Sequence, residues 1–145
     1  AEYTRITYGF TLAAAQMLSV ASPGAAFIYV SGSGTDSTEK GRMMWARVKG
    51  RTENALLRLP RQAYMFRPGF IEPMYGIVSK TPSYRLFYKV LGPTLPLLGR
   101  MLPNQILTTR EIGRAMLAVA RTGYPRRVLE VRDIRQVVGP PAKSS

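Results

Sequence analysis

Three residue types that can together handle a proton follow one another over a short stretch of this chain. Ser31 and Ser33 end an apolar run, and Trp45 and Lys49 come next, four residues apart in a segment with helical character. Residues four apart on a helix share one face, so the indole and the amine should project together. A serine hydroxyl, an aromatic ring and an amine that converge at the end of a strand would form a site able to handle a proton.

The order of the elements around these residues predicts where they meet. The apolar runs 25–30 and 62–67 indicate two strands covered on both faces, as in parallel sheets, and a helix separates them. The second strand ends in Arg67-Pro68-Gly69-Phe70. Open α/β sheets bind ligands outside the carboxyl ends of their strands, so the residues that follow both runs predict one pocket.

Each of these residues also has a purely structural interpretation. Ser31 and Ser33 are residues that turns favour, and Arg67-Pro68-Gly69 could be a rigid turn. Trp45 could serve packing alone, because aromatic side chains mostly contribute burial. Lys49 could lie on a solvated helix face.

Hydrophobic periodicity assigns the first third of the chain to helices on either side of the first strand. Residues 2–21 have apolar positions with a 3.6-residue period, and Ser22-Pro23-Gly24 ends that helix. Asp36 followed by Glu39 has the form of a capping box, although Gly41 leaves the start of the helix open, and the helix is expected to run to about Leu59. Part of the expected apolar stripe of that helix is Met44, Val48 and Ala55.

The rest of the chain predicts a cap, another helix and a last strand. Six prolines and many large apolar groups between Arg67 and Gln105 indicate a small helical cap at about 71–105, with short helices around 83–91 and 94–101. Thr108 and Glu111 form a capping box for a helix that ends at Gly123. One face of that helix carries Ile112, Ala115, Met116 and Val119. Residues 127–131 form a short strand, and 139–145 a disordered tail after a single α/β domain at 1–138.

Composition excludes several kinds of chemistry. The 145 residues include neither cysteine nor histidine, so proton transfer must use Tyr, Lys, Asp, Glu or Ser, and thiolate metal sites are excluded. The net charge of +13 is compatible with solvated helix faces, an anionic cofactor, or nucleic acid or membrane. Because the basic residues are scattered rather than gathered in a run, we do not expect nucleic acid or a membrane as partner.

At this point the chain resembles the short-chain dehydrogenase/reductase superfamily, and more narrowly its atypical, epimerase-like branch. The shared pieces are Val48-Lys49-Gly50-x-x-Glu53, Phe66-Arg67-Pro68-Gly69 and the turn Gly34-Thr35-Asp36, and the resemblance spans residues 3 to about 135. It implies the C-terminal half of a Rossmann-like parallel sheet with flanking helices and the small helical cap. It also implies an NADP or NAD cofactor and a small-molecule substrate.

The resemblance assigns a role to each candidate residue. The catalytic set would be Ser31, Ser33 and Lys49, with Trp45 at the position of the usual tyrosine. The lysine of the family holds the ribose, and the serine orients the carbonyl. The expected cofactor-binding residues are Ser31, Lys49, Arg67, Pro68, Gly69 and Phe70.

Two departures from the family pattern bear on function. Indole has no titratable proton near neutrality, so Trp45 cannot replace the acid/base tyrosine. The chain also contains no Gly-x-x-Gly-x-x-Gly, the loop whose backbone N–H groups would receive the pyrophosphate. By resemblance the first four strands of the domain are absent, and we expect the uncovered surface to favour self-association or a partner chain.

Two functions therefore stay open. The first is the C-terminal half of an NAD(P)-dependent oxidoreductase or epimerase-like protein that transfers hydride. The second is a catalytically silent, NADPH-binding regulatory or scaffold protein, which Trp45 favours. A cytoplasmic location is expected in either case.

Overall fold

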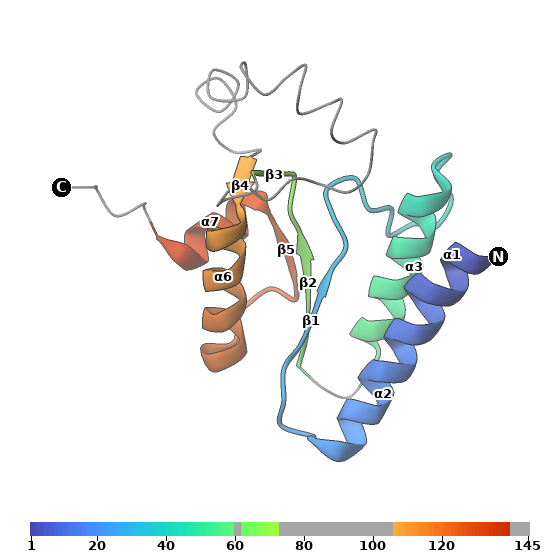
Figure 1. Ribbon diagram of the computed structural model, residues 1–145, viewed down its shortest axis with the longest axis horizontal. Coiled ribbons are helices and arrows are strands. Elements are labelled where there is room, and N and C mark those ends of the chain that lie inside the picture. Colours follow the sequence, from blue (N-terminus) through green and yellow to red (C-terminus); the bar gives the residue numbers. More distant parts are fainter. Residues whose placement is uncertain (60–61, 73–105, 140–145) are drawn as a thin grey trace.

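The computed structural model describes residues 1–59, 62–72 and 106–139 and has a mixed α/β architecture (Figure 1). Three parallel strands, β1 (Phe27–Val30), β2 (Ala63–Arg67) and β5 (Val128–Glu130), form a sheet in the order β1-β2-β5. Helices flank this sheet. The predicted α/β class is confirmed, and the small parallel sheet is consistent with part of a Rossmann-like fold.

The sheet carries a separate apolar cluster on each face, because successive side chains of a strand point to opposite sides. On one face, Tyr64 and Phe66 of β2 pack with residues of α6 (Thr109–Thr122) and α7 (Val131–Val138). On the other face, Ala63 and Met65 pack with α2 (Thr11–Ala21) and α3 (Met44–Leu57). Residues Ala63 to Phe66 are all buried, as the unalternating apolar run predicts. The same prediction is wrong for β1, whose residues are only half-buried and end in Val30 at 39% exposure, because β1 lies at the edge of the described sheet.

The predicted helix over residues 2–21 is confirmed, although it is not regular throughout. A short α1 (Glu2–Thr4) leads into the six-residue π-helix η1 (Arg5–Phe10), which continues as α2. Leu12 and Ala15 face the protein core. The opposite side of α2 is exposed, with Met17 at 73% and Val20 at 85% of their full accessibility.

The capping box predicted at Asp36–Glu39 is wrong, because α3 begins at Met44. The carboxylate of Asp36 closes a turn instead, accepting hydrogen bonds from Thr38 N at 3.0 Å and Gly41 N at 2.6 Å. The predicted apolar stripe of this helix is wrong at Met44, which is 50% exposed, whereas Val48 and Ala55 are half-buried. The buried face of α3 consists of Ala46, Gly50, Thr52, Glu53 and Leu56.

The second predicted capping box is confirmed. Thr108 Oγ1 accepts a hydrogen bond from Glu111 N, and the Glu111 carboxylate accepts one from Thr108 N, so α6 begins with both donors satisfied. Ile112, Ala115 and Val119 are buried as predicted. Gly123 ends the helix with a φ of 72°, a conformation that favours glycine.

Two features were not predicted. Strands β3 (Phe70–Glu72) and β4 (Ile106–Thr108) pair in parallel as a second small sheet, which brings together the two ends of the expected cap segment. Residues 131–138 form α7, a helix that was not predicted, and its first residue, Val131, had been assigned to the last strand. The helices expected at 83–91 and 94–101 and the tail at 139–145 lie outside the described residues, apart from Gly139, which ends α7.

Candidate functional site

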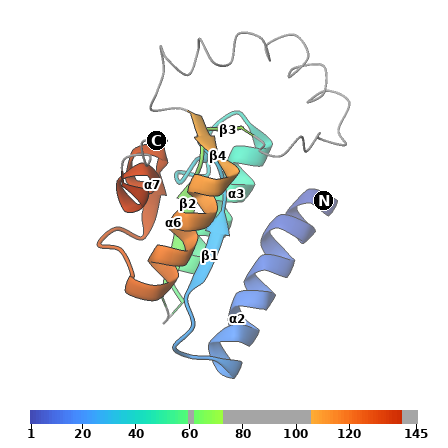
Figure 2. The same cartoon turned by 60° about the vertical axis from the view of Figure 1, so that its left-hand side comes forward.

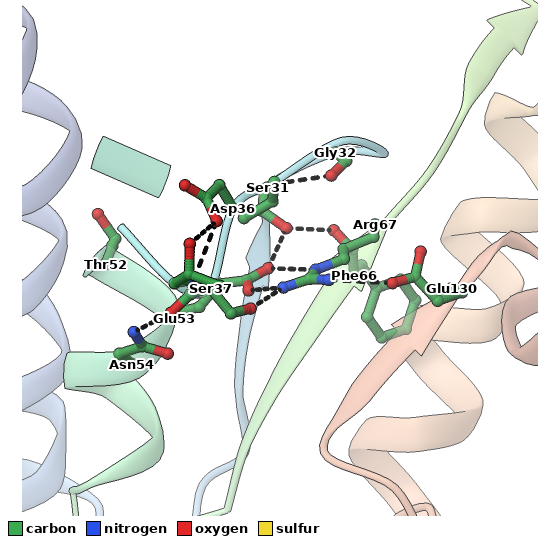
Figure 3. A network of polar contacts seen from close by, with 12 residues as sticks. Ser31, Gly32, Asp36, Ser37, Thr52, Glu53, Asn54, Phe66, Arg67 and Glu130 are labelled. Carbon is green, nitrogen blue, oxygen red and sulfur yellow. Dashed lines mark hydrogen bonds and ion pairs between the residues drawn. The ribbon is translucent and has the colours of Figure 1, made fainter. Parts of the chain in front are cut away.

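The candidate site lies where β1, β2 and β5 reach their carboxyl ends. Backbone pairing continues past the strands, because Ser31 N donates to Phe66 O at 2.9 Å and Ser33 N donates to Pro68 O at 2.8 Å. The segments that follow β1 and β2 are therefore held side by side. Figure 3 shows the polar side chains that meet at this edge.

Ser31 is tied to a carboxylate that the sequence analysis left without a role. Its Oγ lies 2.5 Å from Glu53 Oε1, and the carbonyl oxygen of Phe66 is 3.2 Å away. Ser31 is 2% exposed and Glu53 is fully buried. A hydroxyl has one proton, so while it is donated to Glu53 the Ser31 oxygen can only accept a hydrogen bond from a ligand.

The Arg67 guanidinium neutralises this buried carboxylate through a bidentate ion pair. Its Nε lies 3.0 Å from Glu53 Oε1 and its Nη2 lies 2.5 Å from Glu53 Oε2. The guanidinium also donates to Glu130 Oε1 at 3.1 Å and to Ser37 Oγ at 2.5 Å (Figure 3). Hydrogen bonding to Glu53 raises the pKa of Arg67 above its ordinary value, against the effect of burial. Arg67 thus connects α3, the β1–α3 loop and the end of β5.

Lys49 reaches back from α3 to the end of β1. Its Nζ donates a hydrogen bond to the backbone carbonyl of Ser31. Burial lowers the pKa of the Lys49 amine below its ordinary value, and the charge of Glu53 opposes that change. An ammonium has three donors, and the contacts among the described residues use one of them, which leaves two for a ligand at this edge.

Trp45 lies one helical turn before Lys49 and is half-buried. The tip of its indole, Cη2, is 3.5 Å from the position that a Cβ would occupy on Gly34. The indole is therefore close to the loop that follows β1. A φ of 83° at Gly34 lies in the left-handed region, where glycine is favoured.

The β1–α3 loop is held by hydrogen bonds within itself and to α3. Thr35 Oγ1 donates to Gly32 O at 2.7 Å, and Asp36 N donates to Ala46 O at 3.1 Å. The hydrogen bond from the Thr38 hydroxyl and that from Gly41 N lower the pKa of Asp36. Gly50 allows α3 to approach this loop closely, because a Cβ there would lie 1.8 Å from Asp36 O.

The structure brings together part of the predicted set. Ser31, Lys49 and Arg67 belong to one connected group of polar contacts, and Pro68 is bonded to Ser33 through the backbone. The Ser33 residue is exposed. Phe70 begins β3 directly after Gly69. The roles predicted for these residues in catalysis and cofactor binding stay predictions.

Sequence reasoning missed the partners that hold this group in place, Glu53 above all, together with Ser37 and Glu130. One signal for Glu53 was available. It follows Lys49 by four residues, so the two side chains share a face of α3.

A comparison of the sequence with protein-family models and with curated proteins found no match. Within the residues that the structure describes, no helix combines the length and the apolar character that crossing a membrane requires.

Proposed function

We propose that this chain is the C-terminal half of a protein that binds a nicotinamide dinucleotide, NADP or NAD, at the carboxyl edge of its parallel sheet. The observation that supports this most is the contact between Lys49 Nζ and the Ser31 carbonyl, which holds the amine at the end of β1. Parallel sheets bind nucleotides at this edge. The cofactor assignment itself comes from the resemblance described above.

The residues at this edge fit one part of such a cofactor. Among the described residues Lys49 uses one of its three donors, which leaves two for ribose hydroxyls. By the resemblance, Arg67-Pro68-Gly69 would line the pocket, with Phe70 and Ile71 beside the nicotinamide. The sequence lacks the glycine-rich loop with which the family binds the pyrophosphate. That part of the cofactor would be held by the half of the domain that the resemblance leaves out.

The surface around β1 supports the proposal that a further part of the domain packs against this chain. β1 is an edge strand of the described sheet, and Ile6, Phe10, Met17 and Val20 expose apolar side chains on the outer side of the adjacent helix. Exposed edges and apolar patches of this kind favour association. In our proposal another part of the protein, a partner chain or a second copy covers them.

Replacing Lys49 with methionine should weaken NADPH binding about tenfold or more, the effect of losing a hydrogen bond to a charged group. Isothermal titration calorimetry on the complete natural product would measure the change. The matched control is Lys40→Met, an exposed lysine in the β1–α3 loop, which should leave the affinity unchanged. Equal NADPH affinity in the wild type and the Lys49→Met variant, or no binding at all, would contradict the proposal.

A second candidate function is a catalytically silent dinucleotide-binding protein. Two observations favour it over hydride transfer. Trp45 has no proton to exchange near neutrality. The Ser31 hydroxyl lies within hydrogen-bond distance of Glu53, so its proton is directed inward and away from a substrate carbonyl.

Replacing Trp45 with tyrosine distinguishes these two functions. In a silenced site, the new phenol should raise NADPH-dependent reduction of a panel of aldehydes and ketones by about 100-fold or more, the usual contribution of a general acid. Loss of NADPH absorbance gives the rate, and Trp45→Phe is the control without a titratable proton. Wild-type turnover that neither substitution changes would show that the chemistry does not use this position.

A further inference from the structure

The outer face of α6 carries a line of arginines that the site at the sheet edge does not use. Arg110, Arg114, Leu117 and Arg121, which we call the arginine ridge, are spaced by four, three and four residues. At 3.6 residues per turn this spacing places them on one face. All four are exposed, and the buried side of α6 carries Ile112, Ala115 and Val119. In Figure 2 α6 lies on the outside of the molecule.

The charge of the ridge is not neutralised within the described residues. Residues 106–139 contain seven arginines and three acidic residues, a formal surplus of four positive charges. Each of the three acids is engaged elsewhere. Glu111 caps α6 through Thr108, Glu130 pairs with Arg67, and Asp133 pairs with Arg126. In the described part of the chain, the ridge guanidinium groups form no salt bridge.

We propose that the arginine ridge binds the phosphate backbone of a nucleic acid duplex without reading its sequence. From Arg110 to Arg121 the helix rises about 16 Å, along which a duplex presents several phosphates. Guanidinium groups donate two parallel hydrogen bonds to phosphate oxygens, which lysine cannot do. The sequence analysis set nucleic acid aside because the arginines form no run in the chain, but the helix aligns three of them on one exposed face.

A membrane surface fits the same charge less well. A helix that binds a bilayer buries an apolar face among the lipids. The apolar face of α6 is already packed in the protein core, and Leu117, at 59% exposure, is the one large apolar side chain on the ridge. A nucleic acid needs no such face, because phosphate contacts supply most of its non-specific affinity.

The test compares two triple variants that lower the net charge equally. The ridge variant is Arg110→Gln, Arg114→Gln and Arg121→Gln. The control is Arg5→Gln, Arg42→Gln and Arg58→Gln, which removes three exposed arginines from other elements. Binding of the full chain to a fluorescein-labelled 20-base-pair duplex of mixed sequence would be measured by fluorescence anisotropy at several salt concentrations.

We expect the ridge variant to bind the duplex at least tenfold more weakly than the wild type. The slope of log binding constant against log salt concentration should become shallower by about 2.7, which corresponds to three lost phosphate contacts. The control should keep most of the wild-type slope. Equal losses in both variants would overturn the proposal, since net charge alone would then explain binding. Wild-type binding to phosphatidylserine vesicles with none to the duplex would overturn it as well. The substituted side chains are exposed, and the thermal unfolding of both variants, followed by Trp45 fluorescence, should match that of the wild type.

Discussion

Replacing Glu53 with alanine should cost about 3–5 kcal/mol of folding free energy, because it leaves the Arg67 guanidinium largely buried without its main partner. The Glu53 side chain is 1% exposed and that of Arg67 is 14% exposed, so water cannot readily replace the lost contact. The same change removes the acceptor of the Ser31 hydroxyl. Urea unfolding followed by the fluorescence of Trp45, the single tryptophan of the chain, would measure the loss.

Two further variants show whether burial is the cause. Glu2→Ala breaks an exposed ion pair with Arg5 at 3.9 Å and should change stability by less than about 1 kcal/mol. The double change Glu53→Met and Arg67→Met removes both charges and should recover part of what Glu53→Ala loses. A loss below about 1 kcal/mol for Glu53→Ala would contradict a structural role for the pair.

Replacing Gly50 with alanine should destabilise the fold by about 3 kcal/mol or more, or prevent folding, because the chain has no room for the added methyl group. Its Cβ would lie 1.8 Å from the backbone oxygen of Asp36 and 2.4 Å from the carbonyl carbon. Backbone atoms cannot turn aside as a flexible side chain can. To relieve this clash, α3 and the β1–α3 loop would have to separate, which would disturb the positions of Lys49 and Ser31.

Gly113→Ala is the matched control within the same chain. Gly113 also lies inside a helix, α6, but among the described residues no atom beyond its chain neighbours and its own helix backbone lies within 4 Å of the position that a Cβ would occupy. Alanine there should stabilise the protein by about 0.5–1 kcal/mol, the usual gain in a helix interior. Thermal or urea unfolding should therefore show a lower free energy of unfolding for Gly50→Ala and a higher one for Gly113→Ala. Similar changes in stability for the two variants would show that the close approach at Gly50 does not require a glycine.

Together these contacts describe a sheet edge that is held firmly and offers a ligand few free donors. The Arg67 guanidinium and the Glu53 carboxylate satisfy one another, and the Ser31 hydroxyl lies against that carboxylate. Among the described residues Lys49 uses one of its three donors. We propose that this edge binds sugar hydroxyls, and Trp45→Tyr separates binding alone from hydride transfer.

Much of the fold could be predicted from local patterns. The strands at 25–30 and 62–67 were evident from unbroken apolar runs, and the observed strands lie within these ranges. The capping box at Thr108 was predicted correctly because its two residues satisfy one another within a single turn. The same pattern failed at Asp36, whose carboxylate is used by Thr38 and Gly41 in a turn that precedes α3.

The sequence by itself determined the α/β class, the parallel strands, and the placement of Ser31, Lys49 and Arg67 near one sheet edge, because these follow from apolar runs and chain order. Only the tertiary structure decided that Glu53 is the residue around which that edge is organised. Its partners lie 22 and 14 residues away along the chain, and no local periodicity reports a pairing over such a distance. The close approach at Gly50 likewise exists only because α3 packs against its own preceding loop.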